Sequence, residues 1–251
     1  MRILRNTAKR LLGWTLYPLL ISGAIKRLKA HDAQSIEEWI DYVMRFKYGF
    51  ARKGFHIQIK PIQFKSEILG FLKLLQNQRP RIVCEIGTAS GGTLFLFSKL
   101  AAPDAKLISI DLPWGKFGLG YLPAQIPLFR SFARDQQQIV LLREDSHATE
   151  TFDKVVVHLK GEMIDCLLLD GDHSYEGAKK DFQMYSKLVK KGGVIAFHDI
   201  VPGPPQLAGE VHRLWPEIKG NYEHKEFVED WNQGGAGLGV VFWDGRGAIE
   251  I

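Results

Sequence analysis

The stretch Arg81-Ile82-Val83-Cys84-Glu85-Ile86-Gly87-Thr88-Ala89-Ser90-Gly91-Gly92-Thr93 decides the fold of this 251-residue chain. Its first half is typical of a buried strand, because Ile82, Val83 and Ile86 are β-branched. Glycines follow, and the run from Thr93 to Leu100 has a helical pattern. A strand, a glycine turn and a helix together indicate a nucleotide-type site, since glycines let the backbone approach a ligand and the helix N-terminus offers free N–H groups.

The spacing of these glycines indicates which ligand the turn binds. A dinucleotide fingerprint reads G-x-G-x-x-G and a P-loop ends in Gly-Lys-Ser/Thr, whereas this segment reads E-x-G-x-x-x-G with no lysine after the last glycine. That pattern resembles motif I of the class I S-adenosylmethionine-dependent methyltransferases. By this resemblance, the cofactor contacts are Glu85, Gly87, Thr88, Ser90 and Gly91. A Rossmann-type turn that binds another nucleotide is the alternative.

Charge is distributed unevenly along the chain. Residues 1–30 contain seven lysines and arginines and no acid, so the remainder has 26 basic against 28 acidic residues. The main domain therefore offers no basic face for nucleic acid, and we expect no nucleic-acid partner. Cys84 and Cys166 both lie in apolar runs, which indicates buried, reduced thiols and fits a reducing compartment.

The basic N-terminal arm contains an apolar stretch, residues 11–25. As a straight helix this stretch would span roughly 22 Å, short of the ~30 Å hydrocarbon core of a bilayer. A signal peptide is one interpretation. Another is an interfacial helix with Trp14 and Tyr17 at the level of the lipid headgroups, which would place a cytoplasmic enzyme at the inner membrane surface. The third is an arm packed on its own domain or on a second subunit of a homo-oligomer.

The periodicity of the rest predicts an α/β fold with a Rossmann-like, doubly wound, mostly parallel seven-stranded sheet and N-terminal helices. Amphipathic helices are expected over 35–50 and 63–77, with an irregular segment at 51–62 between them. Another helix should start at the cap Ser174 and run to the glycines 192–193. The predicted segments are an arm at 1–30, a helical cover at 31–78 and a methyltransferase domain at 79–251.

Two places after the glycine loop are expected to hold the rest of the cofactor. Asp111 ends the strand 105–110, where a carboxylate can accept hydrogen bonds from ribose hydroxyls. Asp145 and Ser146 follow the strand 138–142, where the methyltransferase pattern places the adenine contacts. His147 is either catalytic or a surface-turn histidine, with the second more consistent with its position. Glycines and large aromatics over 112–130 suggest a mobile substrate lid.

Acids also follow the next two strands, which are predicted over 164–169 and 194–197. Asp170 and Asp172 follow the first of them, and Asp199 follows the second. The carboxyl ends of parallel strands meet at one edge of a sheet, where ligands bind. The carboxylates of Asp170 and Asp199 are therefore expected to converge on one cation.

The segments Asp170-Gly171-Asp172-His173-Ser174-Tyr175-Glu176-Gly177 and Gly192-Gly193-Val194-Ile195-Ala196-Phe197-His198-Asp199 resemble the family of macrolide and aminocoumarin sugar O-methyltransferases and cephalosporin-hydroxylase-like proteins. The resemblance implies a Mg²⁺ site formed by an acid after the fourth strand and an acidic pair after the fifth. Here Asp170 and Asp199 match, but His198 replaces an acid, which favours Mn²⁺, Fe²⁺ or Zn²⁺.

The sequence therefore predicts a metal-assisted S-adenosylmethionine-dependent O-methyltransferase that acts on a sugar, a glycan or a related small molecule. The metal would lower the pKa of the acceptor hydroxyl, and Asp172 or His173 would take its proton. One alternative is a non-catalytic, membrane-associated protein that binds S-adenosylmethionine. A hydroxylase is less well supported, because its iron site needs two histidines and one carboxylate. The H-x-D/E triplet of such a site occurs only at His224-Lys225-Glu226, and no histidine follows it.

Overall fold

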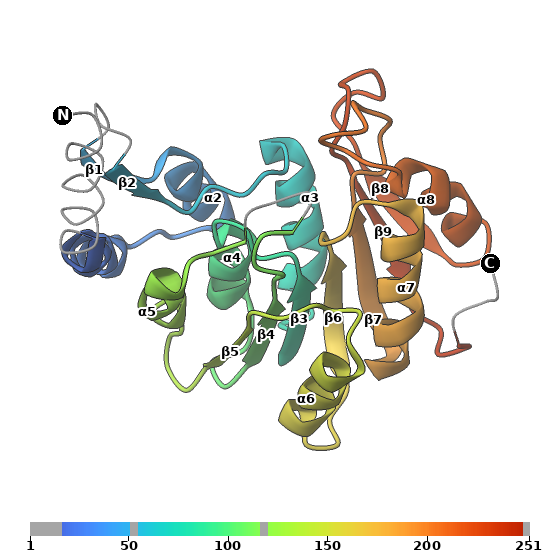
Figure 1. Ribbon diagram of the computed structural model, residues 1–251, viewed down its shortest axis with the longest axis horizontal. Helices are drawn as coiled ribbons and strands as arrows, with labels where there is room; N and C mark the ends of the chain where they lie inside the picture. The colour runs from blue at the N-terminus through green and yellow to red at the C-terminus, as the bar shows by residue number, and fades with distance from the viewer. Residues whose placement is uncertain (1–16, 51–54, 116–119, 248–251) are drawn as a thin grey trace, which may run out of the picture.

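The computed structural model describes residues 17–50, 55–115 and 120–247, which contain a seven-stranded sheet (Figure 1). The spatial order is β5-β4-β3-β6-β7-β9-β8, and β9 alone runs in the direction opposite to the other strands of this sheet. The strands are β3 (Ile82–Ile86), β4 (Lys106–Ile110), β5 (Gln138–Leu142), β6 (Ile164–Leu169), β7 (Val189–His198), β8 (His224–Phe227) and β9 (Leu238–Phe242). The predicted Rossmann-like sheet is confirmed.

Helices cover both faces of this sheet because its strands are apolar on both sides. In β3, Val83 belongs to one hydrophobic core and Cys84 to the other. The first core is shared with α2 (Ile36–Arg45), α3 (Lys65–Gln76), α4 (Gly92–Leu100) and α5 (Ile126–Arg130). The second is shared with α6 (Thr149–Leu159), α7 (Tyr175–Tyr185) and α8 (Val211–Lys219). Because neighbouring strands from β5 to β7 pair in parallel, their carboxyl ends lie at one edge of the sheet, as in other doubly wound sheets.

The N-terminal arm is described only from residue 17, and residues 17–29 are helical. The apolar face of this helix, which includes Leu20, Ile21, Ala24 and Leu28, is buried in the first core. Tyr17 is partly buried against the same core. This part of the arm thus packs on its own domain, while Trp14 lies outside the described residues. Within the described part of the chain, no helix is both long and apolar enough to cross a membrane.

The helical cover differs from the prediction at its centre. The helix expected over 35–50 ends at Arg45, because Phe46 has extended backbone angles. Residues beyond it form β1 (Lys47–Phe50), which pairs antiparallel with β2 (Phe55–Gln58). The expected irregular segment therefore contains one strand of a hairpin. A polar residue alternates with an apolar one in Lys47-Tyr48 and in His56-Ile57, which is a signal for a strand. This signal is short, and the helical pattern of residues just before it led to the prediction of a longer helix.

Two later segments also differ from the prediction. The expected loop over 112–130 contains the 3₁₀ turn η2 (Pro123–Gln125) and α5, whose Leu128 and Phe129 are buried, so this part is packed. Residues 116–119 lie outside the described ranges. The helix expected to reach 191 ends at Tyr185 and passes through η3 (Ser186–Leu188) into β7. The sequence analysis did not predict α6.

Candidate functional site

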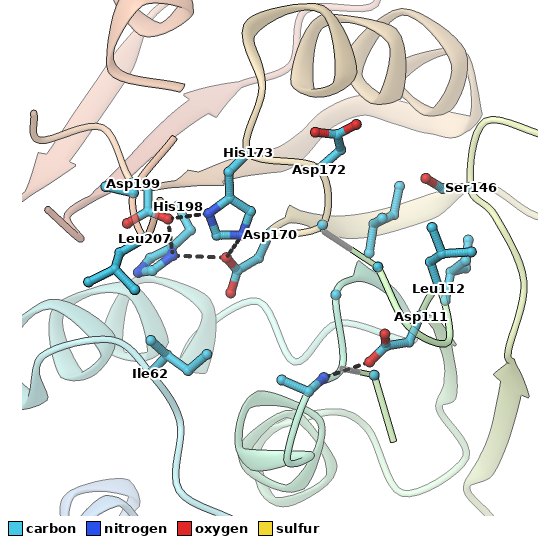
Figure 2. Close-up of a pocket in the computed structure, with 18 of the residues that line it drawn as sticks. Ile62, Asp111, Leu112, Ser146, Asp170, Asp172, His173, His198, Asp199 and Leu207 are labelled. Atoms are coloured by element: carbon cyan, nitrogen blue, oxygen red, sulfur yellow. Dashed lines mark hydrogen bonds and ion pairs between the residues drawn. The ribbon is translucent and has the colours of Figure 1, made fainter. Parts of the chain in front are cut away.

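A cavity of about 510 Å³ opens at the carboxyl ends of the parallel strands. Figure 2 shows two groups of side chains in it. Asp111, Leu112 and Ser146 lie at one end, which we call the cofactor end. The carboxylates and imidazoles that follow β6 and β7 lie at the other, which we call the acceptor end, and these are Asp170, His173, His198 and Asp199.

The glycine loop brings the backbone of β3 against the end of β6. Gly87 has a φ of +96°, and a Cβ there would lie 1.9 Å from the carbonyl oxygen of Asp170. Gly91 has a φ of +79°, and a Cβ there would lie 2.6 Å from the ring of Phe129. Only glycine fits these two positions without moving its neighbours. The sequence pattern thus reflects a close backbone approach at Gly87 and helix packing at Gly91.

Asp111 is held in the cavity by the same loop. Its Oδ2 accepts hydrogen bonds from the backbone N–H groups of Thr88 at 3.1 Å and Ala89 at 2.7 Å. Its Oδ1 is thereby positioned to accept from a hydroxyl group of a ligand. Burial raises the pKa of Asp111 to about 6, although the two backbone donors oppose this shift. The carboxylate is therefore ionised at neutral pH.

Glu85 lies behind the glycine loop, on the side away from the cavity, and holds it through hydrogen bonds. It is 1% exposed, and its carboxylate accepts from the hydroxyls of Thr93 at 2.7 Å and Ser109 at 3.0 Å. Burial raises its pKa to about 8, so its neutral form predominates at pH 7. Glu85 is not among the residues that line the cavity. Its place in the structure is therefore one of support for the loop.

Three other loop residues predicted to bind the cofactor also lie behind the cavity surface. The Thr88 hydroxyl contacts that of Ser109, and the Ser90 hydroxyl donates to the carbonyl of Lys60 at 2.6 Å. Neither residue lines the cavity, nor does Gly91. Among the predicted loop residues, Gly87 lines it directly. The others fix the shape of the turn.

The segment after β5 completes the cofactor end. Asp145 and Ser146, the predicted adenine contacts, both line the cavity, and Tyr185 of α7 donates to the backbone carbonyl of Ser146 at 2.8 Å. His147 is not a surface-turn histidine, since it lines the cavity and its Nε2 lies 3.3 Å from the buried carboxylate of Asp181. Asp181 lies in α7, far from His147 in the sequence, so the residues around His147 did not indicate this partner.

At the acceptor end, two imidazoles bridge two carboxylates. Nδ1 of His198 lies 2.8 Å from Oδ1 of Asp170 and 3.3 Å from Oδ2 of Asp199. Nδ1 of His173 lies 2.7 Å from Oδ2 of Asp199, and its Nε2 lies 3.6 Å from Oδ1 of Asp170. The predicted convergence of Asp170 and Asp199 is thus observed, and His173 joins His198 between them.

The electrostatics of this cluster favour charged imidazoles. Burial alone would lower the pKa of His198, but the charge of Asp170 and hydrogen bonds to both carboxylates raise it well above its ordinary value. The pKa of His173 is raised for similar reasons. Burial would raise the pKa of Asp199, but hydrogen bonds from His173 and His198 hold it below its ordinary range.

Asp172 lies apart from this cluster (Figure 2). Its Oδ1 accepts the backbone N–H of Ser174 at 2.9 Å, at the start of α7. Ser174 itself caps α7 by accepting from Gly177 at 3.1 Å, as predicted. The carboxylate of Asp172 is therefore directed at the start of the helix and not at the cluster. Of the two predicted proton acceptors, His173 is therefore the better placed.

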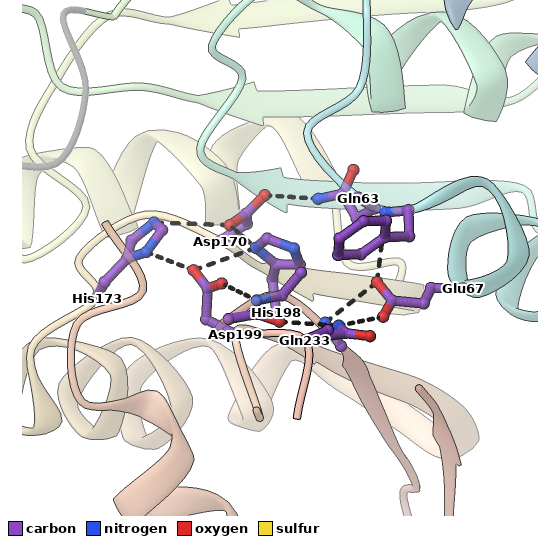
Figure 3. Close-up of polar contacts among 11 residues, drawn as sticks. Gln63, Glu67, Asp170, His173, His198, Asp199 and Gln233 are labelled. Carbon is purple, nitrogen blue, oxygen red and sulfur yellow. Dashed lines mark hydrogen bonds and ion pairs between the residues drawn. The ribbon is translucent and has the colours of Figure 1, made fainter. Parts of the chain in front are cut away.

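Side chains from distant segments fix the acceptor end, and the sequence analysis did not identify them (Figure 3). Gln63 is 2% exposed and donates from Nε2 to Oδ2 of Asp170 at 2.9 Å. Glu67 is 1% exposed and accepts from Gln233 at 2.7 Å, which anchors the β8–β9 loop that lines the cavity. An acid in the apolar stripe of α3, in line with Phe71, is the one signal that the sequence offered for Glu67.

Comparisons with known proteins agree with this site. Residues 84–200 match a family model described as a methyltransferase domain, and this segment contains every predicted site residue. The uncharacterized protein y4gI of Sinorhizobium fredii is 27% identical over 178 residues, 68% of this chain and 18% of that protein. The uncharacterized protein R132 of Acanthamoeba polyphaga mimivirus is 39% identical over 67 residues, 26% of this chain and 30% of that protein. The matches span less than a third of both relatives.

Solved structures share the fold. The O-methyltransferase TomG of Streptomyces achromogenes, in complex with SAM, superimposes with a TM-score of 0.54 at 14% identity, covering 86% of this chain and 92% of that one. An O-methyltransferase of Bacillus cereus, in complex with SAH, gives 0.53 at 17% identity, covering 85% and 93%. Residues 84–200 therefore match a methyltransferase domain, as the sequence predicts, and the chain shares its fold with these O-methyltransferases.

Proposed function

We propose that this methyltransferase transfers the methyl group of S-adenosylmethionine to a hydroxyl of a sugar, a glycan or a related small molecule, with a divalent cation assisting. One observation carries the proposal: a single cavity joins the Asp111 carboxylate at the glycine loop to the pair of carboxylates at Asp170 and Asp199. Oxygen as the acceptor atom is supported by the two structural neighbours, which are O-methyltransferases.

The cofactor end fits S-adenosylmethionine. The positive φ of Gly87 lets the backbone turn tightly beside the cavity, and Asp111 offers a carboxylate for the ribose hydroxyls. Asp145 and Ser146 would face the adenine. When bound, the cofactor supplies an electrophilic methyl group on a sulfonium.

The acceptor end fits a divalent cation. Asp170, His173 and Asp199 each offer one ligand atom, and these atoms lie within 4.8 Å of one another. His198 lies beside this group, with its Nδ1 2.8 Å from Oδ1 of Asp170 and 3.3 Å from Oδ2 of Asp199. Mixed carboxylate and imidazole donors favour Mn²⁺ over Mg²⁺. Such an ion would lower the pKa of the acceptor hydroxyl.

The residues of the acceptor end can also move the proton. The acceptor hydroxyl loses its proton to an imidazole, its oxygen bonds to the methyl carbon, and the carbon–sulfur bond breaks to leave S-adenosylhomocysteine. His173 is the proposed proton acceptor in its neutral form, which an ion held by Asp170 and Asp199 would favour by offsetting the carboxylate charges that raise the pKa of His173. Asp199 orients its Nδ1, and the ring lines the cavity. His198 is 3% exposed and bridges both carboxylates, so it orients them.

The test is a screen of candidate glycans and other hydroxyl compounds with isotopically labelled S-adenosylmethionine. The proposal predicts a product heavier by one labelled methyl group, loss of transfer in excess chelator, and recovery with Mn²⁺ better than with Mg²⁺. Methylation of nitrogen or sulfur would contradict the proposed acceptor. Full transfer in excess chelator would contradict the cation and leave His173 as a metal-free base.

The cellular setting is also a proposal. We place the enzyme in the cytoplasm, with peripheral contact to the inner membrane surface through residues 1–30, whose basic charge suits anionic lipid. Liposome sedimentation of the full chain and of residues 31–251 tests this contact. Salt-sensitive pelleting of the full chain alone supports it. Equal pelleting, or none, supports the packed arm that residues 17–29 already display.

A further inference from the structure

An ion pair outside the catalytic cluster fastens the cofactor end to α7. His147 follows β5 and lines the cavity beside Asp145 and Ser146. Its Nε2 lies 3.3 Å from Oδ1 of Asp181 and 3.2 Å from the carbonyl oxygen of Gly177, both in α7. A carboxylate and a carbonyl can only accept, so Nε2 carries a hydrogen. The charge of the ring therefore depends on the proton at Nδ1.

Asp181 makes this pairing consequential. It is 1% exposed, so burial raises the pKa of its carboxyl, and the hydrogen bonds from His147 and Ser146 oppose that shift. An ionised carboxylate without such partners is costly at this depth. The charged groups that face the pair are Asp145, on the same loop as His147, and Asp172, at the start of α7. The buried Cys84 and Tyr185 also adjoin it. These acids favour a protonated His147, whose pKa is raised chiefly by its hydrogen bond to Asp181.

A second contact ties the same loop to the same helix. The Tyr185 hydroxyl donates to the backbone carbonyl of Ser146 at 2.8 Å. The residues that would face the adenine are therefore attached to α7 by the ionic contact of His147 and by a neutral attachment, which comprises the Tyr185 contact and a hydrogen bond between Ser146 and Asp181. The neutral attachment is independent of pH near neutrality, whereas the ionic one requires the proton on His147.

We infer that His147 and Asp181 form a positioning pair that holds residues 144–147 against the adenine, and that the proton on His147 is linked to binding of the cofactor. This inference rests on the proposed function, because the adenine contact belongs to it. A histidine held protonated by a partner contributes fully below its ordinary pKa and ceases to contribute as the pH rises through its raised pKa. Affinity for the cofactor should therefore fall on the alkaline side.

Calorimetric titration with S-adenosylhomocysteine at pH 6.5 and pH 9 tests the linkage. Between pH 6.5 and pH 9, we expect the affinity of the wild type to fall by roughly fivefold or more beyond the fall in affinity of His147→Gln. The amide in that variant donates a hydrogen bond as the imidazole does, but it carries no charge. The amino group of the ligand titrates in every variant, so the difference between variants is the measured quantity. His158→Gln, in α6 and outside the cavity, is the matched control and should behave as the wild type.

A measurement without cofactor separates this inference from the proposed function. In the free protein, NMR titration of the His147 ring should give a raised pKa that falls in Asp181→Asn. Parallel pH profiles of the wild type and His147→Gln, or a His147 ring that titrates identically in Asp181→Asn, would overturn the pair. A raised, Asp181-dependent pKa with no ligand binding in the wild type would instead overturn the cofactor assignment and leave the pair standing.

Discussion

The two ends of the cavity hold their carboxylates by different means. At the cofactor end, Asp111 is held by backbone N–H groups of the loop that follows the adjacent strand. At the acceptor end, Asp170 and Asp199 are held by two imidazoles and the amide of Gln63, and Asp199 also accepts the backbone N–H of Ala236 from the distant β8–β9 loop. The position of the backbone N–H groups depends on the sequence of the glycine loop itself, whereas the side-chain network depends on segments that meet only in the folded chain.

The same difference appears in the charges. At the cofactor end, burial raises the pKa of Glu85 to about 8 and that of Asp111 to about 6, because the neutral donors around these two acids oppose the effect of burial only in part. Burial acts on Asp199 in the same direction, yet the two imidazoles lower its pKa overall. The cofactor end therefore holds a neutral Glu85 beneath an ionised Asp111, whereas the acceptor end holds carboxylates paired with imidazoles. Substitutions at the two ends should have separable consequences.

The largest expected effect is at the acceptor end. Asp170→Asn removes a charge that pairs with both imidazoles, and methyl transfer should fall by roughly a thousandfold. The measurement is the initial rate of labelled methyl transfer to an acceptor found in the screen. Asp104→Asn, which removes only a surface partner of Arg81, is the control and should retain full activity. A rate near that of the wild type in Asp170→Asn would contradict a reacting centre at this end.

The second effect concerns the support beneath the cofactor end. Because the pKa of Glu85 is raised to about 8, its stabilising contribution is complete below pH 4.5 and is lost as the pH rises through 8. The free energy of unfolding of the wild type should therefore fall relative to Glu85→Gln by on the order of 3 kcal/mol between pH 5 and pH 8. Urea unfolding at several pH values measures this.

Glu162→Gln is the matched control for this experiment, because Glu162 is exposed and its one ion pair, with Lys106, is 3.6 Å long. Its unfolding free energy should follow that of the wild type at each pH. If the free energy of unfolding of Glu85→Gln also ran parallel to that of the wild type, Glu85 would be ionised in the folded protein, and the prediction of a neutral acid beneath the cofactor end would be wrong.

The third and smallest effect comes from a residue that only orients another. Gln63→Ala removes the donor to Asp170 and should weaken Mn²⁺ binding by about tenfold, since groups that orient metal ligands have effects of roughly 10–100-fold. Electron paramagnetic resonance of free Mn²⁺ gives the affinity without an acceptor. Gln78→Ala, in an exposed turn, serves as the control. Equal Mn²⁺ affinity in both variants would exclude Gln63 from this role.

The contrast between the two ends explains what the sequence could predict. The glycine loop, Asp111, Asp170 and Asp199 each follow a strand, so a local pattern sufficed to place them at one edge of the sheet. Gln63 meets Asp170 across 107 residues of sequence, and Glu67 meets Gln233 across 166, so no local pattern identifies these pairs. His147 was interpreted as a turn residue for the same reason, because its partner Asp181 lies on another helix.

The central claim is that Asp111 binds the cofactor while Asp170 serves the reaction. Calorimetric titration of S-adenosylhomocysteine at pH 8, where Asp111 with its pKa of about 6 is ionised, tests this division in a single experiment. Asp111→Ala should lose about 1–3 kcal/mol of binding free energy through its missing charge-assisted hydrogen bonds, while Asp170→Asn should bind as the wild type does. Unchanged affinity in Asp111→Ala, or an equal loss in Asp170→Asn, would contradict it.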